Sequence, residues 1–155
     1  MACRVDLAIV SELFSASDLD QRFKALGLSV GSVGAVVTFI GQVRESGDRP
    51  NVTGLRLEHY AGMTERVLQR HIANACARWE LLGIVLVHRV GEMCLGESIV
   101  GVAVASAHRQ AAFDAVQYLM DFLKHDAPFW KQEVTNHGAE WVEQKETDLE
   151  RVKRW

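Results

Sequence analysis

Two stretches of the chain carry apolar residues at three- and four-residue spacing, which is the period of an amphipathic helix. The first runs from about Thr64 to Trp79, and its apolar stripe consists of Val67, Leu68, Ile72, Ala75, Cys76 and Trp79. The second runs from about Arg109 to Asp126, with a predicted core face of Ala112, Phe113, Val116, Met120 and Leu123. Pro128 disfavours helical backbone in the residue before it, so the second helix is expected to end there.

Other segments have the pattern of strands, either alternating in polarity or apolar on both faces. The predicted strands are Val5 to Val10, Ala35 to Val43, Thr53 to His59, Ile84 to His88 and Ser98 to Ser106. A short helix is expected from Ser17 or Asp18 to Leu26, and a hairpin between Phe129 and Val142. Helices packed on several mostly antiparallel strands predict one α+β domain over residues 1–155, with a strand order that the pattern leaves open.

Composition limits the classes of function. The chain has 155 residues, of which 48% are hydrophobic and 24% charged, as in a compact globular protein. Its net charge of −3 gives no overall attraction to nucleic acid or to anionic lipid, so neither is an expected partner. The N-terminus lacks a signal-peptide pattern, and the three cysteines form no Cys-x-x-Cys pair. We therefore expect a cytoplasmic protein that binds any anion through a local basic cluster.

One such cluster is predicted where the strand ending at Ser106 turns into the second long helix. His108 and Arg109 lie at this turn, beside backbone N–H groups that have no partner within the helix. These residues are typical of a phosphate site, although basic residues also occur at helix starts by chance. Arg44 ends a buried strand and opens the turn-rich segment 45–51, which we expect to be mobile. It is a second candidate, with a solvated strand end as the alternative.

Two lysines mark the other end of the second long helix. Lys124 lies in its last turn, where a positive charge also favours the helix dipole without any further role. Lys131 follows the break at Pro128 and is either a solvated strand residue or a lysine partly desolvated by neighbouring aromatic side chains. Desolvation would lower the lysine pKa and make the amine useful as an acid, base or nucleophile.

The spacing of these groups predicts a dimer. Arg109 and Lys124 are 15 residues apart, so one straight helix separates them by about 22 Å. One small-molecule pocket cannot span that length. We therefore expect a two-fold homodimer in which each site uses Lys124 and Lys131 of one subunit and His108 and Arg109 of the other.

The histidines do not indicate a metal site. Five of them, at positions 59, 71, 88, 125 and 137, lack metal-ligand spacing and are expected in solvated or hydrogen-bonded surface positions. An acidic helix is expected over residues 143–153, most simply as a solvated face, and Lys145 within it is a further candidate cation.

Five segments together resemble the molybdopterin synthase large-subunit family, in its order and spacing. They are Gly34-Ala-Val-Val-Thr-Phe-Ile-Gly-Gln-Val-Arg44, Leu57-Glu-His-Tyr-Ala-Gly-Met-Thr-Glu65, His88-Arg-Val-Gly-Glu92, Ala105-Ser-Ala-His-Arg109 and Lys124-His-Asp-Ala-Pro-Phe-Trp-Lys131. The resemblance begins near Gly34 and extends to the C-terminus.

The resemblance implies an α/β hammerhead-type fold and a sulfurtransferase. It implies a central homodimer that forms a heterotetramer with two small ubiquitin-like subunits, each with a C-terminal Gly-Gly thiocarboxylate. The implied substrate is a pyranopterin with a cyclic phosphate, which two sulfur transfers convert to molybdopterin. Neither a metal nor a redox cofactor is expected. A non-catalytic scaffold of the same fold is the main alternative, and an unrelated phosphate-binding enzyme is a second.

The resemblance also implies roles for individual residues. Lys124 matches the family's catalytic lysine and Lys131 its second pocket lysine. Substrate-binding positions of the family are matched by Arg44, His108 and Arg109. Four more residues fall in binding segments: Gln42, Gln132, Glu133 and Lys145. Gln42 stands where some relatives have lysine, and Lys145 where an arginine occurs.

Overall fold

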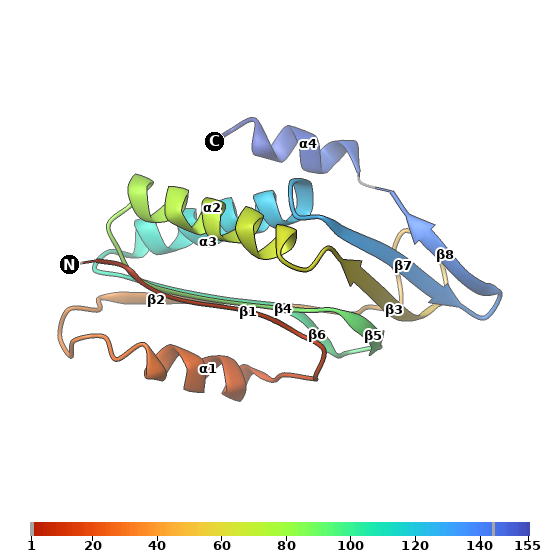
Figure 1. The fold of residues 1–155 in the computed structure, drawn as a ribbon, viewed down its shortest axis with the longest axis horizontal. Coiled ribbons are helices and arrows are strands. Elements are labelled where there is room, and N and C mark those ends of the chain that lie inside the picture. Colours follow the sequence, from red (N-terminus) through yellow and green to blue (C-terminus); the bar gives the residue numbers. More distant parts are fainter. Residues whose placement is uncertain (1, 144) are drawn as a thin grey trace.

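The computed structural model describes residues 2–143 and 145–155, which form two four-stranded sheets flanked by helices (Figure 1). The first sheet has the order β1 (Arg4–Val10), β4 (Leu81–Arg89), β6 (Ser98–Ser106) and β2 (Ala35–Gln42). The second has the order β5 (Gly91–Cys94), β3 (Val52–His59), β7 (Phe129–Thr135) and β8 (Gly138–Val142). The pair β1 and β4 is parallel, and the other neighbours are antiparallel. The predicted α+β class is confirmed.

Helices cover both faces of the first sheet (Figure 1). Helix α1 (Ala16–Ala25) lies on one face, and its start is fixed by a capping box between Ser15 and Asp18. Helices α2 (Met63–Arg78) and α3 (Arg109–His125) lie on the other face, and α4 (Glu146–Val152) packs on α3. No helix in the described part of the chain is long and apolar enough to cross a membrane.

The central strands β4 and β6 are buried on both faces, which their unbroken apolar sequences require. Side chains alternate along each strand. Ile84 and Val102 belong to the core cluster under α2 and α3, whereas Val85 and Ala103 pack with Leu19 of α1. The first sheet thus separates two cores, and both are built on the same two strands.

Several features differ from the sequence prediction, among them the start of α1, which is capped by Ser15 and not by Ser17 or Asp18. Phe113 was expected in the core but is 59% exposed. The predicted Ala112, Val116 and Leu123 are buried, so most of the predicted face is confirmed. The buried face extends to Ala115 and Leu119 and not to Phe113, which lies about 100° from Ala112 around the helix axis. Strand β5 was not predicted, because four residues that include an exposed Glu92 give too short a pattern.

Candidate active site

Three lysines from separate elements gather near the C-terminal end of α3. Lys124 lies in the last turn of α3, Lys131 in β7 and Lys145 just before α4. The Nζ atom of Lys131 lies 3.4 Å from Oε1 of Glu133 and 3.9 Å from Oδ2 of Asp48, and Lys145 forms an ion pair with the same aspartate. The structure therefore brings three predicted site lysines around two carboxylates.

The loop between β2 and β3 closes this cluster from one side. The backbone N–H of Asp48 donates to Oε1 of Glu133 at 3.0 Å, and Glu133 is only 1% exposed. Gly47 permits the contact, because a Cβ atom there would lie 2.1 Å from the same oxygen. Arg49 adds an ion pair to Glu140 of β8. The segment that we predicted to be mobile is thus tethered to the second sheet.

The two carboxylate oxygens of Glu133 differ in their surroundings. Within the described residues, its Oε2 atom is buried and has no hydrogen-bond partner. A buried carboxylate oxygen without a partner is energetically costly. It is therefore a natural place for a donor of a bound substrate.

The surroundings of Lys124 make its ammonium group easier to deprotonate. The residue is exposed overall, but protein atoms crowd its ammonium group. That burial, followed by the positive charge of Lys131, lowers the pKa of Lys124, and the negative charges of Asp148 and Asp48 oppose the shift only in part. The ion pair with Lys145 is the main reason that the pKa of Asp48 is lowered. The cluster therefore holds an ionised carboxylate beside an amine that releases its proton more readily than a free lysine.

A buried histidine lies close to Lys124. His88 in β4 is 7% exposed and stacks on Phe129, with ring centroids 3.9 Å apart and an interplanar angle of 15°. Its Nδ1–H donates to the carbonyl oxygen of Arg89 at 3.0 Å. Burial lowers the pKa of His88 to about 4, and the nearby charge of Lys124 contributes in the same direction. His88 and His71, which is 5% exposed, correct the prediction of surface histidines.

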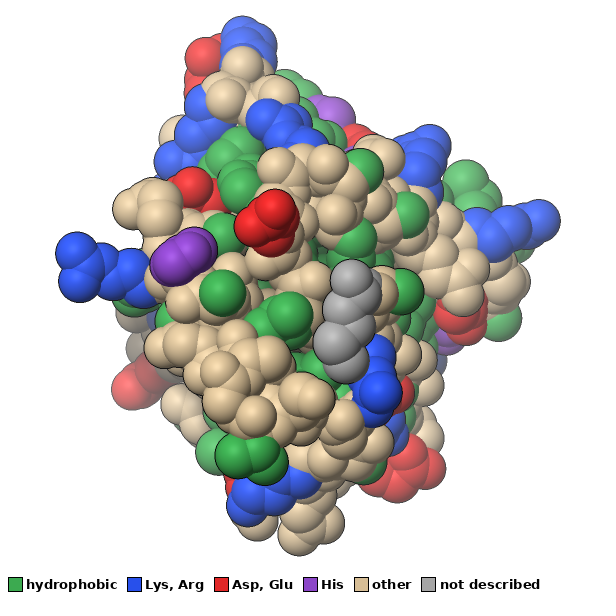
Figure 2. Space-filling view, turned by 90° about the vertical axis from the view of Figure 1, so that its left-hand side faces the viewer, with side chains coloured by type: hydrophobic (Ala, Val, Ile, Leu, Met, Phe, Trp, Pro, Cys, Tyr) green, Lys and Arg blue, Asp and Glu red, His purple; other side chains and the backbone are tan. Residues whose placement is uncertain are grey.

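The two other predicted site residues of α3 lie at its opposite end (Figure 1). His108 is the residue before the first turn, Arg109 begins the helix, and both are exposed. That turn contains no acidic residue to offset the helix dipole. Figure 2 looks onto this end of the molecule, where Lys and Arg side chains project at separate places around hydrophobic ones. Because α3 is unbroken, Arg109 and Lys124 of one chain do not share a pocket.

The remaining predicted residues are more dispersed. Arg44 is exposed at the start of the loop that carries Asp48. The side-chain amide of Gln42 donates to the carbonyl oxygen of Gly96 at 3.0 Å. Gln132 lies between Lys131 and Glu133 in β7, so alternation places its side chain on the opposite face of the sheet.

Sequence reasoning missed the two aspartates that act on the lysines, Asp48 and Asp148. Asp48 lies in a turn-rich loop and Asp148 in an acidic helix, where carboxylates are ordinary. Only the pairing of the loop with β7, 85 residues away, gives Asp48 its partner Glu133. No local pattern carries that information.

A partly buried lysine cluster in an α+β domain is suited to acid–base or nucleophilic group transfer. Residues 9–126 match the family model described as MoaE protein. The chain is 47% identical over 155 residues to the molybdopterin synthase catalytic subunit of Pseudomonas aeruginosa, covering 100% of this chain and 99% of that protein. It is 50% identical over 122 residues to the protein of that name from Escherichia coli K12, covering 79% and 81%.

Solved structures agree with these sequence matches. The molybdopterin biosynthesis MoaE protein from Burkholderia ambifaria MC40-6 has a TM-score of 0.80 and 36% identity, with 97% of each chain covered. Molybdopterin synthase from Staphylococcus aureus has a TM-score of 0.76 and 29% identity, with 87% and 95% covered. The chain therefore belongs to the MoaE protein family, and its activity class is that of the curated relatives, a sulfurtransferase subunit.

Proposed function

We propose that this chain is the catalytic subunit of a molybdopterin synthase and that the lysine cluster at the end of α3 carries the reaction. The sulfur donor is a small ubiquitin-like subunit with a C-terminal Gly-Gly thiocarboxylate, and the acceptor is a pyranopterin with a cyclic phosphate. The observation that carries the proposal is the crowded ammonium group of Lys124, whose pKa is lowered by burial and by the charge of Lys131.

The side chains of the lysine cluster suit the proposed sulfur transfer. In each transfer the thiocarboxylate sulfur bonds to a carbon of the pterin side chain as the carbon–oxygen bond at that carbon breaks. The departing oxygen is protonated, and a water molecule then cleaves the carbon–sulfur bond to the tail, which leaves as a carboxylate. Lys124 accepts and returns the proton that accompanies the departing oxygen. Lys131 and Lys145 stabilise negative charge, while Asp48 and Glu133 keep the lysines in place.

The substrate phosphate is held by His108 and Arg109 of a second copy of the chain, together with Arg44. Support comes from their exposure and from the first turn of α3, which offers backbone N–H groups and no acidic residue. The working assembly is thus a homodimer of one-domain chains with a small subunit for each site. Its location is the cytoplasm, where reduced cysteines are stable.

A reconstituted assay tests the proposal. It combines the purified chain, a thiocarboxylated small subunit and the pyranopterin, and follows the product as its fluorescent oxidised form. Lys124→Ala is expected to lower kcat at least about 100-fold while the fold and the affinity for the small subunit are retained. Near-normal turnover would remove Lys124 from the mechanism. Tight partner binding by a wild-type chain that forms no product would favour a scaffold.

A further inference from the structure

Two cysteines that lie far apart in the sequence meet at the edge of the first sheet. Cys3 directly precedes β1, and Cys76 lies in the last turn of α2. Figure 1 shows the start of β1 and the end of α2 at the same end of the molecule. Both side chains are partly buried and pack against the same core cluster, which lies between the first sheet and helices α2 and α3.

The alternation along β1 and the apolar stripe of α2 bring the two side chains together. Leu7 and Ile9 of β1 pack on the core cluster under α2 and α3, whereas Val10 packs on the α1 side of the sheet. Alternation therefore turns Cys3 to the same side as Leu7 and Ile9, toward α2. Cys76 belongs to the stripe with which α2 covers this core. The two thiols accordingly form a hydrogen bond with each other.

This hydrogen bond makes the two thiols unequal. Together with burial it raises the pKa of Cys3, whereas it lowers the pKa of Cys76 against the opposing effect of burial. The thiolate is the nucleophilic form of cysteine, so Cys76 is the sulfur that reacts first with an oxidant. Cys3 then remains beside it as the thiol that can displace the oxidised group.

We propose that Cys3 and Cys76 are a redox-sensitive pair, which a hydroperoxide converts to a disulfide between the start of β1 and α2. In the first step the Cys76 thiolate bonds to one oxygen of the hydroperoxide and the O–O bond breaks. The other oxygen takes a proton from solvent and leaves as an alcohol or as water. In the second step the Cys3 sulfur bonds to the Cys76 sulfur and the S–O bond breaks. The oxygen leaves with the Cys3 proton as water, so two thiols give two electrons to one peroxide.

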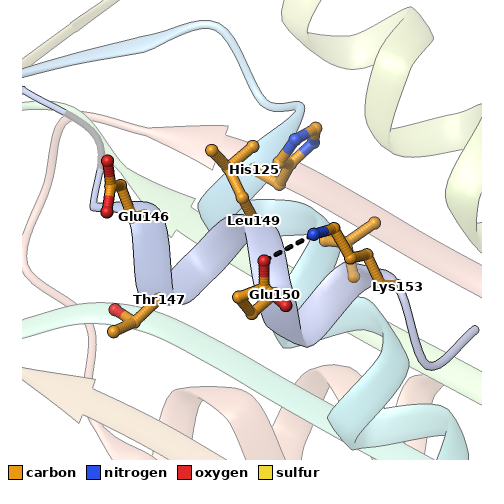
Figure 3. Close-up of a pocket in the computed structure, with 7 residues that line it drawn as sticks. His125, Glu146, Thr147, Leu149, Glu150 and Lys153 are labelled. Atoms are coloured by element: carbon orange, nitrogen blue, oxygen red, sulfur yellow. Dashed lines mark hydrogen bonds and ion pairs between the residues drawn. The ribbon is translucent and has the colours of Figure 1, made fainter.

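The pair lies away from the lysine cluster. Trp79, which follows Cys76 at the end of α2, packs edge-on against Tyr118 in the middle of α3, whereas the lysine cluster lies at the end of α3. A cavity of about 660 Å³ lies between that end and α4, where Figure 3 shows Leu149 and Glu150. No cysteine is among the described residues that line it. The disulfide therefore ties β1 to α2 and leaves the lysine site open.

Mass spectrometry identifies the bond. The test uses Cys94→Ser, which removes the exposed third cysteine of the chain. After treatment with hydrogen peroxide and digestion without reduction, we expect a peptide pair joined through Cys3 and Cys76, in chains that run as monomers on a denaturing, non-reducing gel. Dithiothreitol should separate the pair. Sulfinic acid at Cys76 without a joined pair, or joined pairs only between two different chains, would overturn the proposal.

Trapping of the intermediate tests the order of the two steps. In Cys3→Ser, made in the Cys94→Ser background, the Cys76 sulfenic acid has no thiol to displace its oxygen, so dimedone should capture it. With Cys3 present, the sulfenic acid should be consumed before dimedone reacts. Equal capture in the two proteins would show that Cys3 does not reach the oxidised sulfur, which contradicts the proposed pair.

Thermal unfolding measures the effect of the bond on the fold. A disulfide restricts the unfolded chain, so the Tm of oxidised Cys94→Ser should lie about 5–15 °C above that of the reduced protein and return after dithiothreitol. Cys3→Ser in the same background is the matched control, and peroxide should leave its Tm unchanged. An oxidised protein that melts no higher than the reduced one would mean that the bond forms only by distorting the fold, and this result would contradict the proposal.

Discussion

His88 shows how far the surroundings of one residue can depart from what its sequence context indicates. It lies next to Arg89 at the end of β4, in a stretch that gives no sign of a buried imidazole. Stacking on Phe129 and a hydrogen bond to a backbone carbonyl oxygen satisfy the neutral ring. The same hydrogen bond compensates the charged ring only in part for its lost solvent, so folding favours the neutral form.

This environment predicts an acid-sensitive contribution to stability. The pKa of His88 is about 4 in the folded chain, against about 6.5 for an unfolded histidine. Between these values the unfolded chain binds the extra proton, so stability falls as the pH decreases. Between pH 7 and pH 5 the free energy of unfolding of the wild type should fall by about 2 kcal/mol more than that of His88→Asn.

Urea unfolding at the two pH values measures this difference. His137→Asn, at an exposed turn, is the matched control and should follow the wild type. Equal losses in the wild type and in His88→Asn would show that His88 is not held neutral.

Gly47 is a residue whose role depends on a distant partner. The Cβ atom of Gly47→Ala would meet Oε1 of Glu133, so the loop or the Glu133 side chain must shift and the hydrogen bond from the Asp48 N–H is weakened or lost. We expect a local cost of about 1–3 kcal/mol and a lower kcat, because the ion pairs of Asp48 with Lys131 and Lys145 move with the loop. Steady-state assays with Ser46→Ala, an exposed neighbour, as control would measure the effect. An unchanged kcat would show that the position of this loop does not affect the reaction.

At the level of elements, α4 is anchored by the end of the chain. Asp121 of α3 is 7% exposed and accepts hydrogen bonds from Nη2 of Arg154 at 2.6 Å and from Nε1 of Trp155 at 2.7 Å. The backbone carbonyl oxygen of Trp155 also accepts from Arg78 of α2 at 2.7 Å. These contacts fix one end of α4, and Lys145 at its other end reaches the lysine cluster.

Asp121→Asn is therefore expected to loosen the whole C-terminal segment. We predict that the free energy of unfolding falls by about 1–3 kcal/mol. The loss stays in this range because Arg154 is partly solvent-exposed and water screens its attraction to Asp121. Hydrogen exchange should rise in α4 more than in α2. Asp114→Asn, on the exposed side of the same helix, serves as control. Unchanged exchange in α4 would mean that other contacts hold it.

Periodicity predicted most elements of this fold because the signals are local. The stripe of α2 and the β-branched sequence of β6 each determine their own structure. Most of the predicted face of α3 is buried, but Phe113 is exposed, because Phe113 and Ala112 fit overlapping stripes and only packing on the sheet decides between them. The lysines of the site were predicted, whereas the partners that tune them depend on contacts between distant segments.

At the scale of the whole molecule, the length of α3 is the central constraint. Its seventeen residues keep Arg109 and Lys124 at opposite ends, so a site that uses both needs two copies of the chain. The family assignment and the fold are established independently of this point. The composite site remains a prediction.

The most direct test is a complementation experiment. Arg109→Ala and Lys124→Ala chains carrying different tags are coexpressed, and the heterodimer is isolated through both tags. Each parent should be nearly inactive, whereas the heterodimer keeps one intact site and should show about half of the wild-type turnover. A Lys124→Ala and Lys131→Ala heterodimer is the control and should stay inactive, because both lysines belong to the same subunit of each site. No recovery in the first heterodimer would contradict a site shared between two copies of α3.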